Sequence, residues 1–286
     1  MIDPHHLVGL PPETIRHRFE RRDTILYALG VGAGQQGDER ELFYVCEDRL
    51  VALPTMAVVL AYPGFWQMEP RYSIDWKQIL HAEQSCDFYA PLPIEGHVRG
   101  ELRIDAIVDK GANKGAFLRA ERLIYSEPDN RLIARVRQIS YLRGDGGCGS
   151  AGQQLEILPI VPDGPPDVQV TLATRPEQAL LYRLSGDGNP LHYDPEVAKA
   201  AGFPSPILHG LCTYGYACRA ILQAALPDNG FNLRKLQCRF TAPVYPGDRL
   251  EVEIWKTSDS ARAFRVSVPA RKTIVLDRGV AVFAEP

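Results

Sequence analysis

The chain lacks the features that would place it in a membrane or on nucleic acid. No run of about 18 or more apolar residues occurs in the sequence, and a transmembrane helix needs roughly that many. The formal net charge is -3, whereas a general nucleic-acid binder usually carries a basic excess. We therefore expect neither a membrane span nor a nucleic-acid partner.

The six cysteines include no C-x-x-C pair; they stand at positions 46, 86, 148, 212, 218 and 238. Because C-x-x-C spacing is typical of zinc and redox sites, we predict free thiols and neither a metal nor a redox cofactor. The N-terminus MIDPHHLVGLPPE lacks the basic start and apolar run of a secretory signal. The C-terminal VAVFAEP ends in no peroxisomal or ER-retention tripeptide. These absences favour a cytoplasmic protein.

Glycine and proline are concentrated in one segment of the chain. Residues 144–167, GDGGCGSAGQQLEILPIVPDGPPD, hold six glycines and four prolines, and such a stretch cannot continue a helix or a central strand. The 286 residues also suit two domains of roughly 140 residues each. We predict an N-terminal domain over residues 1–143, a linker over 144–167 and a C-terminal domain over 168–286.

The two predicted domains resemble each other in sequence. RRDTILYALGVGAG (21–34) aligns with RPEQALLYRLSGDGN (175–189) when Tyr27 is set against Tyr182, and APLPIEG echoes APVYPGD at a similar offset further on. Alternating, β-prone residues follow each echo. A long internal repeat indicates a duplicated domain; chance similarity of short stretches is the alternative.

The second half predicts one long buried helix followed by strands. LCTYGYACRAILQAAL (211–226) is apolar nearly all round, as expected of a helix buried against a sheet. A short helix, DPEVAKAAG (194–202), precedes it, with Asp194 as N-cap and Gly202 as the stop. Strands follow over about 235–284. The expected class is α+β, with an antiparallel sheet wrapped around a central helix.

Asp187, Asn189 and His192 lie within six residues in the segment YRLSGDGNPLHYDPEVAKA. Adding water to an activated alkene requires one group that takes a proton from water and another that delivers one to carbon. A carboxylate and an imidazole can divide this work when burial tunes their pKa values toward neutrality. Taken singly, Asp187 could instead stabilise a turn, and His192 could be a core histidine.

Gly210 ends the motif PILHG, where the long helix is expected to begin. Backbone N–H groups at a helix N-terminus have no intrahelical partner, and the helix dipole is positive there. Such an N–H can hold a thioester carbonyl oxygen as it gains enolate character. A glycine that only permits a turn is the alternative.

SGDGNPLHYDPEVAKAAGFPSPILHGLCTYG resembles the hydratase 2 motif of the MaoC-like dehydratases. LYALGVGAG, ALPTMAVVL, LHAEQ, APLP and DKGANKGA are similar to first-half landmarks of that family, so the resemblance extends over nearly the whole chain. It implies a double hot-dog fold, in which each half wraps a sheet around a long helix and the halves pair like a dimer.

The resemblance also implies the chemistry. Asp187 and His192 match the catalytic residues, Asn189 a supporting one, and Gly210 the oxyanion N–H donor. The implied hydro-lyase reaction is the reversible hydration of trans-2-enoyl-CoA to (R)-3-hydroxyacyl-CoA. Its partners are the acyl-CoA thioester and water, without a metal or other cofactor. Two alternatives stay open: a dehydratase acting on acyl-carrier-protein or on bulky steroid or branched acyl-CoA thioesters, and a non-catalytic acyl-CoA binding module.

The repeat alignment sets Gly32 against Asp187 and Gly37 against His192. The first half therefore lacks the acid/base pair, and one active site per chain is expected. The resemblance implies that this half accommodates the acyl chain. ALPTMAVVLAYPGFW (52–66) is the predicted lining, with a plain core helix as the competing interpretation.

The sequence also departs from the family pattern just before and within the linker. GGCGSA (146–151) stands where the family often has GGFGGK, so the lysine is missing. Lys110 and Asn113, in the turn DKGANKGA, become the candidates for CoA contacts, although a solvated turn is the alternative. A homodimer is compatible with the exposed sheet edges of a hot-dog fold.

Overall fold

The computed structural model describes residues 2–35, 39–225 and 232–285. The strands are β1 (Glu13–Phe19), β2 (Ile79–Phe88), β3 (Gly96–Asp109), β4 (Ala116–Ser126), β5 (Leu132–Leu142), β6 (Ala151–Gly152), β7 (Val168–Ala173), β8 (Leu233–Phe240), β9 (Arg249–Lys256), β10 (Ala261–Val268) and β11 (Thr273–Phe283). The α-helices are α1 (Pro4–Val8), α2 (Arg21–Gly30), α3 (Gln178–Tyr182), α4 (Pro195–Ala200) and α5 (Gly210–Ala225). Short 3-10 helices complete the set: η2 (Glu39–Tyr44), η3 (Glu47–Arg49), η4 (Pro54–Val58), η5 (Trp66–Met68), η6 (Pro70–Tyr72), η7 (Trp76–Gln78), η8 (Arg183–Ser185), η9 (Pro190–His192) and η10 (Pro269–Arg271).

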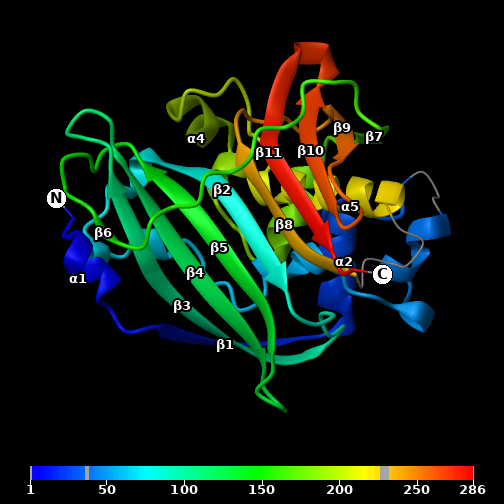
Figure 1. The fold of residues 1–286 in the computed structure, drawn as a ribbon, viewed down its shortest axis with the longest axis horizontal. Coiled ribbons are helices and arrows are strands. Elements are labelled where there is room, and N and C mark those ends of the chain that lie inside the picture. Colours follow the sequence, from blue (N-terminus) through cyan, green and yellow to red (C-terminus); the bar gives the residue numbers. More distant parts are fainter. Residues whose placement is uncertain (1, 36–38, 226–231, 286) are drawn as a thin grey trace.

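The strands form one antiparallel sheet whose two halves have the same topology. Counted from its outer edge, the first half runs β1-β3-β4-β5-β2, and the second half runs β7-β9-β10-β11-β8. The two series meet where β2 pairs with β8 through five register pairs (Figure 1). The same strand order in both halves, with helices α2 and α3 after the equivalent edge strands, is what a duplicated domain produces. The expected α+β double hot-dog architecture is confirmed.

The repeat-equivalent tyrosines meet in the core between the halves. The rings of Tyr27 in α2 and Tyr182 in α3 lie 6.1 Å apart, and both are fully buried. Helices α2 and α3 pack against each other around them. The two tyrosines that the sequence repeat sets against each other therefore also occupy equivalent places in the two halves and pack together.

Helix α5 is the long helix around which the second half of the sheet wraps (Figure 1). It runs from Gly210 to Ala225, close to the predicted 211–226, and residue 226 lies outside the described residues. Its first three turns are almost wholly buried. The short helix before it begins after Asp194, whose carboxylate accepts from the Glu196 N–H as an N-cap should.

The first half departs from the expectation of a long helix in each half. Where α5 has its counterpart, the described chain forms only the five-residue η4 and then turns at Ala61 (φ 49°). The hydrogen bonds that would continue a helix are taken by side chains. Arg122 donates to the carbonyls of Ala57 and Val58, and the Ala61 N–H donates to Nδ1 of His17. The long helix that the resemblance implied for the first half is therefore replaced here by the short, buried η4.

The linker crosses the outer face of the sheet (Figure 1). Trp255 Nε1 donates to the Gly164 carbonyl, and Arg278 donates to the Leu158 carbonyl, so side chains of the second half hold the segment down. On either side of the Leu158 anchor, Ile157 and Ile160 are 89% and 75% exposed. Among the described residues no helix is long and apolar enough to cross a membrane.

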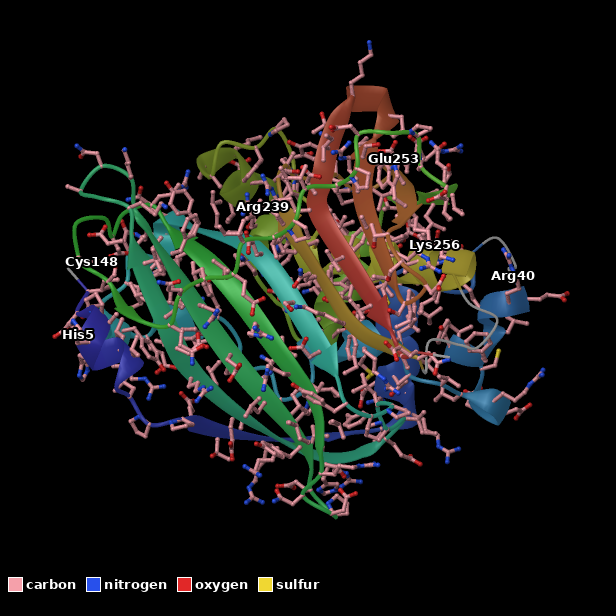
Figure 2. The ribbon with its side chains drawn as sticks, viewed as in Figure 1. His5, Arg40, Cys148, Arg239, Glu253 and Lys256 are labelled. Atoms are coloured by element: carbon pink, nitrogen blue, oxygen red, sulfur yellow. The ribbon has the colours of Figure 1, made fainter. Side chains whose placement is uncertain are left out.

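Ion pairs on the outer face span the junction between the halves. Arg239 on β8 binds the Glu83 carboxylate on β2, and Figure 2 shows Arg239 beside both strands. Arg137 binds Asp87 and Glu156 on the same face. Arg135 and Arg137, the arginines of β5, are therefore both engaged in ion pairs on this face of the sheet.

A buried ion pair ties the first half to α5. Arg219 and Glu41 are each about 2% exposed and bind through two hydrogen bonds of 2.8 and 2.6 Å. Arg219 also donates to the Val31 carbonyl, and Glu41 accepts from the Gly34 N–H and the Gln223 amide. Every bond joins the segment after α2 to α5 or orders that segment itself.

Replacing Glu41 by Gln should leave the Arg219 guanidinium buried without a counter-charge, which usually costs about 3–5 kcal/mol. Urea unfolding should report this loss in the free energy of unfolding. As a matched control, Glu196→Gln removes an exposed partner of Lys199 and should cost at most about 1 kcal/mol. Equal effects of the two changes would contradict the role given to the buried pair.

Candidate active site

The loop between α3 and α4 presents the predicted acid/base residues. Asp187 Oδ1 accepts from the Asn189 N–H at 3.2 Å, and Asn189 Oδ1 accepts from the Leu191 N–H at 3.0 Å. Asn189 is thus the N-cap of η9, the single turn that ends at His192. The Asn189 side chain therefore fixes the turn that carries His192.

His192 is held as a neutral imidazole with one free lone pair. Its Nδ1 lies 2.8 Å from the Ile207 carbonyl, and since a carbonyl only accepts, Nδ1 must carry the proton and Nε2 the lone pair. The side chain is about 9% exposed. Burial lowers the pKa of His192 below its ordinary value, against an opposing effect of Asp187. An imidazole in this state is ready to accept a proton near neutral pH.

The sequence analysis missed a second histidine in the site, His209. Its Nε2 donates to the Asp187 carbonyl at 3.2 Å, and its ring stacks on that of His192 with centroids 3.7 Å apart. Burial above all, and then His192, lower the pKa of His209 to about 2. In the sequence His209 directly precedes Gly210 in PILHG, but nothing in that motif distinguishes it from an ordinary loop histidine.

Asp187, His192 and His209 each place a carboxylate oxygen or a ring nitrogen within 4.8 Å of the other two. Such a set invites comparison with a metal site, but the two rings are inclined by only 28° and stacked. Their in-plane lone pairs therefore run side by side and cannot converge on one ion at the usual distance of about 2.0–2.1 Å. A separation of up to 4.8 Å between Asp187 and His192 instead allows one bridging water, since two hydrogen bonds of about 2.8 Å that meet at a water oxygen at its tetrahedral angle span roughly 4.6 Å.

Gly210 is the first residue of α5, as predicted for an oxyanion donor. Its N–H donates to no acceptor among the described residues, so it is available to a ligand. A Cβ at this position would lie 3.0 Å from the Phe240 ring, which explains why a glycine suits it. The Phe240 ring packs in turn on His81 of β2 at 4.6 Å. The first half therefore packs, through His81 and then Phe240, against the start of α5.

The position equivalent to Asp187 is closed in the first half. Gly32 has a φ of 79°, and a Cβ there would lie 2.3 Å from the Tyr216 hydroxyl, which itself donates to Gln178 Oε1. A carboxylate cannot be accommodated at this point. Gly37, the predicted equivalent of His192, lies outside the described residues.

Lys110 and Asn113 lie on the exposed turn between β3 and β4. In the described structure the Lys110 ammonium lies 5.9 Å from the centre of the Phe117 ring, and neither residue bonds to Asp187 or His192. Asp109 joins this turn to the start of the linker, because its carboxylate accepts from the N–H groups of Gly111, Gly147 and Gly149. The two stretches considered for CoA contacts thus form one surface.

Comparison with known proteins places the chain in a family. The MFE-2 hydratase 2 N-terminal domain matches residues 17–144, and the MaoC like domain matches residues 159–277. The 3-hydroxyacyl-thioester dehydratase Y of Mycobacterium tuberculosis is 39% identical, covering 97% of each chain. The peroxisomal enoyl-CoA hydratase 2 of Arabidopsis thaliana is 37% identical over 85% of this chain and 84% of its own.

A solved structure agrees with these matches. The crystal structure of the MaoC-like dehydratase from Phytophthora capsici superimposes with a TM-score of 0.85 at 29% identity, covering 98% of each chain. The chain belongs to the MaoC-like hydratase 2 family, and it is an enzyme of the hydro-lyase class.

Proposed function

We propose that this protein hydrates trans-2-enoyl-CoA reversibly to (R)-3-hydroxyacyl-CoA, with Asp187 and His192 as its acid/base pair. The observation that carries the proposal is the pair formed by Asp187 and His192, whose carboxylate and ring nitrogen lie within 4.8 Å of each other. His209, bonded to the Asp187 backbone, is followed directly by Gly210, whose N–H at the start of α5 has no acceptor among the described residues. The names of relatives that act on enoyl-CoA and 3-hydroxyacyl thioesters support the substrate class.

In the proposed mechanism, the Gly210 N–H binds the thioester carbonyl oxygen and stabilises it as negative charge develops there. Water lies between Asp187 and His192. As its oxygen bonds to C3, one of its protons passes to the pair, and the pair delivers one proton to C2. The hydroxyl and the hydrogen therefore reach the same face of the alkene, and the pair ends the cycle as it began.

The first half contributes shape in this proposal and no reacting group. Its η4 segment packs against α5, the helix that begins at the proposed oxyanion donor Gly210. Residues 52–66, which include η4, are therefore the proposed lining for the acyl tail. The N-terminal domain (1–143) would accommodate the tail, the C-terminal domain (168–286) would carry the chemistry, and Lys110 with Asn113 would meet CoA. A homodimer and a cytoplasmic location stay predictions. For the location, the relatives include an enzyme that is named as peroxisomal.

The assay that tests the function is hydration of crotonyl-CoA, followed as loss of absorbance of the conjugated thioester. Chiral analysis of the product should give the (R)-3-hydroxy thioester. A dominant (S) product would refute the proposed geometry. Hydration of an acyl-carrier-protein thioester in preference to the CoA ester would support the alternative carrier, and no turnover of either would support a binding module.

Replacing Asp187 by Asn or His192 by Gln should lower kcat by at least about 100-fold, the usual scale for a lost general acid or base. The KM should change little, since neither residue is assigned to substrate binding. Asp194→Asn, a change that preserves the N-cap of α4, serves as the control and should keep kcat. Retention of more than about a tenth of kcat in either site variant would remove that residue from the mechanism.

Enlarging the first-half lining should discriminate against long substrates. Ala57 is fully buried in η4, and each methylene of an acyl tail bound there contributes up to about 0.8 kcal/mol. Ala57→Leu should therefore lower the ratio of kcat/KM for decenoyl-CoA to that for crotonyl-CoA. Ala281→Leu, the same change in the core of the second half, is the control. A ratio that moves only in the control places the acyl tail elsewhere.

A further inference from the structure

His209 touches both members of the acid/base pair, yet the mechanism above gives it no task. The side chain is about 1% exposed. One of its ring nitrogens bonds to the backbone of Asp187, and its ring face covers that of His192. Tyr182 packs at 4.9 Å as a further neighbour of the same ring. Among the described residues, His209 thus contacts both the backbone of the Asp187 loop and the ring of His192.

The hydrogen bonding of His209 fixes its tautomer. Because the Asp187 carbonyl can only accept, Nε2 carries the proton and Nδ1 the lone pair. Nδ1 is buried and has no hydrogen-bond partner in the described part of the chain. A residue that leaves a buried acceptor unsatisfied has an energetic cost of about 1–3 kcal/mol, so the reason for a histidine here must lie in the contacts it does make.

The ring must also stay uncharged to occupy this place. The groups that face it are Asp187, His192, Tyr182 and Arg183. Of these, His192 and Arg183 disfavour a positive charge on His209 and so lower its pKa. A neutral ring can stack on the imidazole of His192 without repelling it when that imidazole takes up a proton.

The backbone of His209 extends the same arrangement to the third element of the site. Its carbonyl accepts from the N–H groups of Cys212 and Thr213 and so opens α5. The next residue is Gly210, the proposed oxyanion donor. One residue is therefore in contact with the Asp187 loop, the His192 ring and the helix start.

We propose that His209 is a positioning residue for the hydration reaction: its Nε2–H holds the Asp187 loop, and its ring holds the orientation of His192. This inference rests on the proposed function, because that function is what makes Asp187 and His192 act together on one substrate and one water. His209 itself exchanges no proton with substrate or water.

Two variants separate the two contacts. His209→Gln keeps an amide N–H that can reach the Asp187 carbonyl and loses the ring. His209→Phe keeps the ring and loses the donor. Each should lower kcat by about 10–100-fold, because misplacement of a reacting group by about 1 Å has this effect, while KM stays within about twofold. His97→Gln, on the exposed surface of β3, is the control and should keep kcat.

The titration of His192 gives a readout that does not depend on turnover. Loss of the ring in His209→Gln admits water beside His192, so burial lowers its pKa less, and the pKa should rise toward 6.5. In His209→Phe the pKa should stay as in the wild type. NMR of the ring nitrogens measures both values, and the acid limb of kcat/KM should move to higher pH in His209→Gln alone.

The outcomes are distinct. Variants that keep more than half of kcat, with no change in the His192 titration, would overturn the positioning role. A lower melting temperature with unchanged kcat in the folded protein would reduce His209 to a structural residue. If the wild-type protein fails to hydrate crotonyl-CoA, the proposed function fails; the NMR titration would then still decide whether His209 controls the environment of His192.

Discussion

The pairing of β2 with β8 is the constraint on which the rest of the structure depends. It turns two five-stranded series into one sheet and leaves each half without a free inner edge. It also brings His81 of the first half behind Phe240, and through it against the start of α5. The first half therefore packs behind the start of α5, next to the candidate site.

The two halves share a topology and differ where chemistry is required. In the second half, helix α5 occupies the concave face and starts at the site. In the first half, Arg122 and His17 take the backbone groups that would have continued a helix, and the chain ends its turn at Ala61. Burial lowers the pKa of Arg122 to about 10, yet the group remains charged at neutral pH. The buried Arg122 cation thus occupies two carbonyls that a continuing helix would use as acceptors.

The local features of the sequence predicted their structures well. The nearly all-round apolar character of residues 211–226 located α5, the Asp194 cap located α4, and the repeat set Tyr27 against Tyr182. Features set by distant residues could not be read in this way. The η4 turn depends on Arg122, which lies 64 residues beyond Val58. His209 resembles an ordinary loop histidine until the fold stacks it on His192, so only the structure added it to the site.

The linker connects halves that are already joined without it. Five register pairs, the Glu83–Arg239 bridge and the buried Arg219–Glu41 pair all cross from one half to the other. The linker adds anchors on the outer face and exposes Ile157 and Ile160 to solvent. As a covalent connection, the linker therefore mainly keeps each half at a high effective concentration near the other. Two separate chains, divided within this segment, would therefore be expected to assemble through these contacts into a heterodimer with the same continuous sheet.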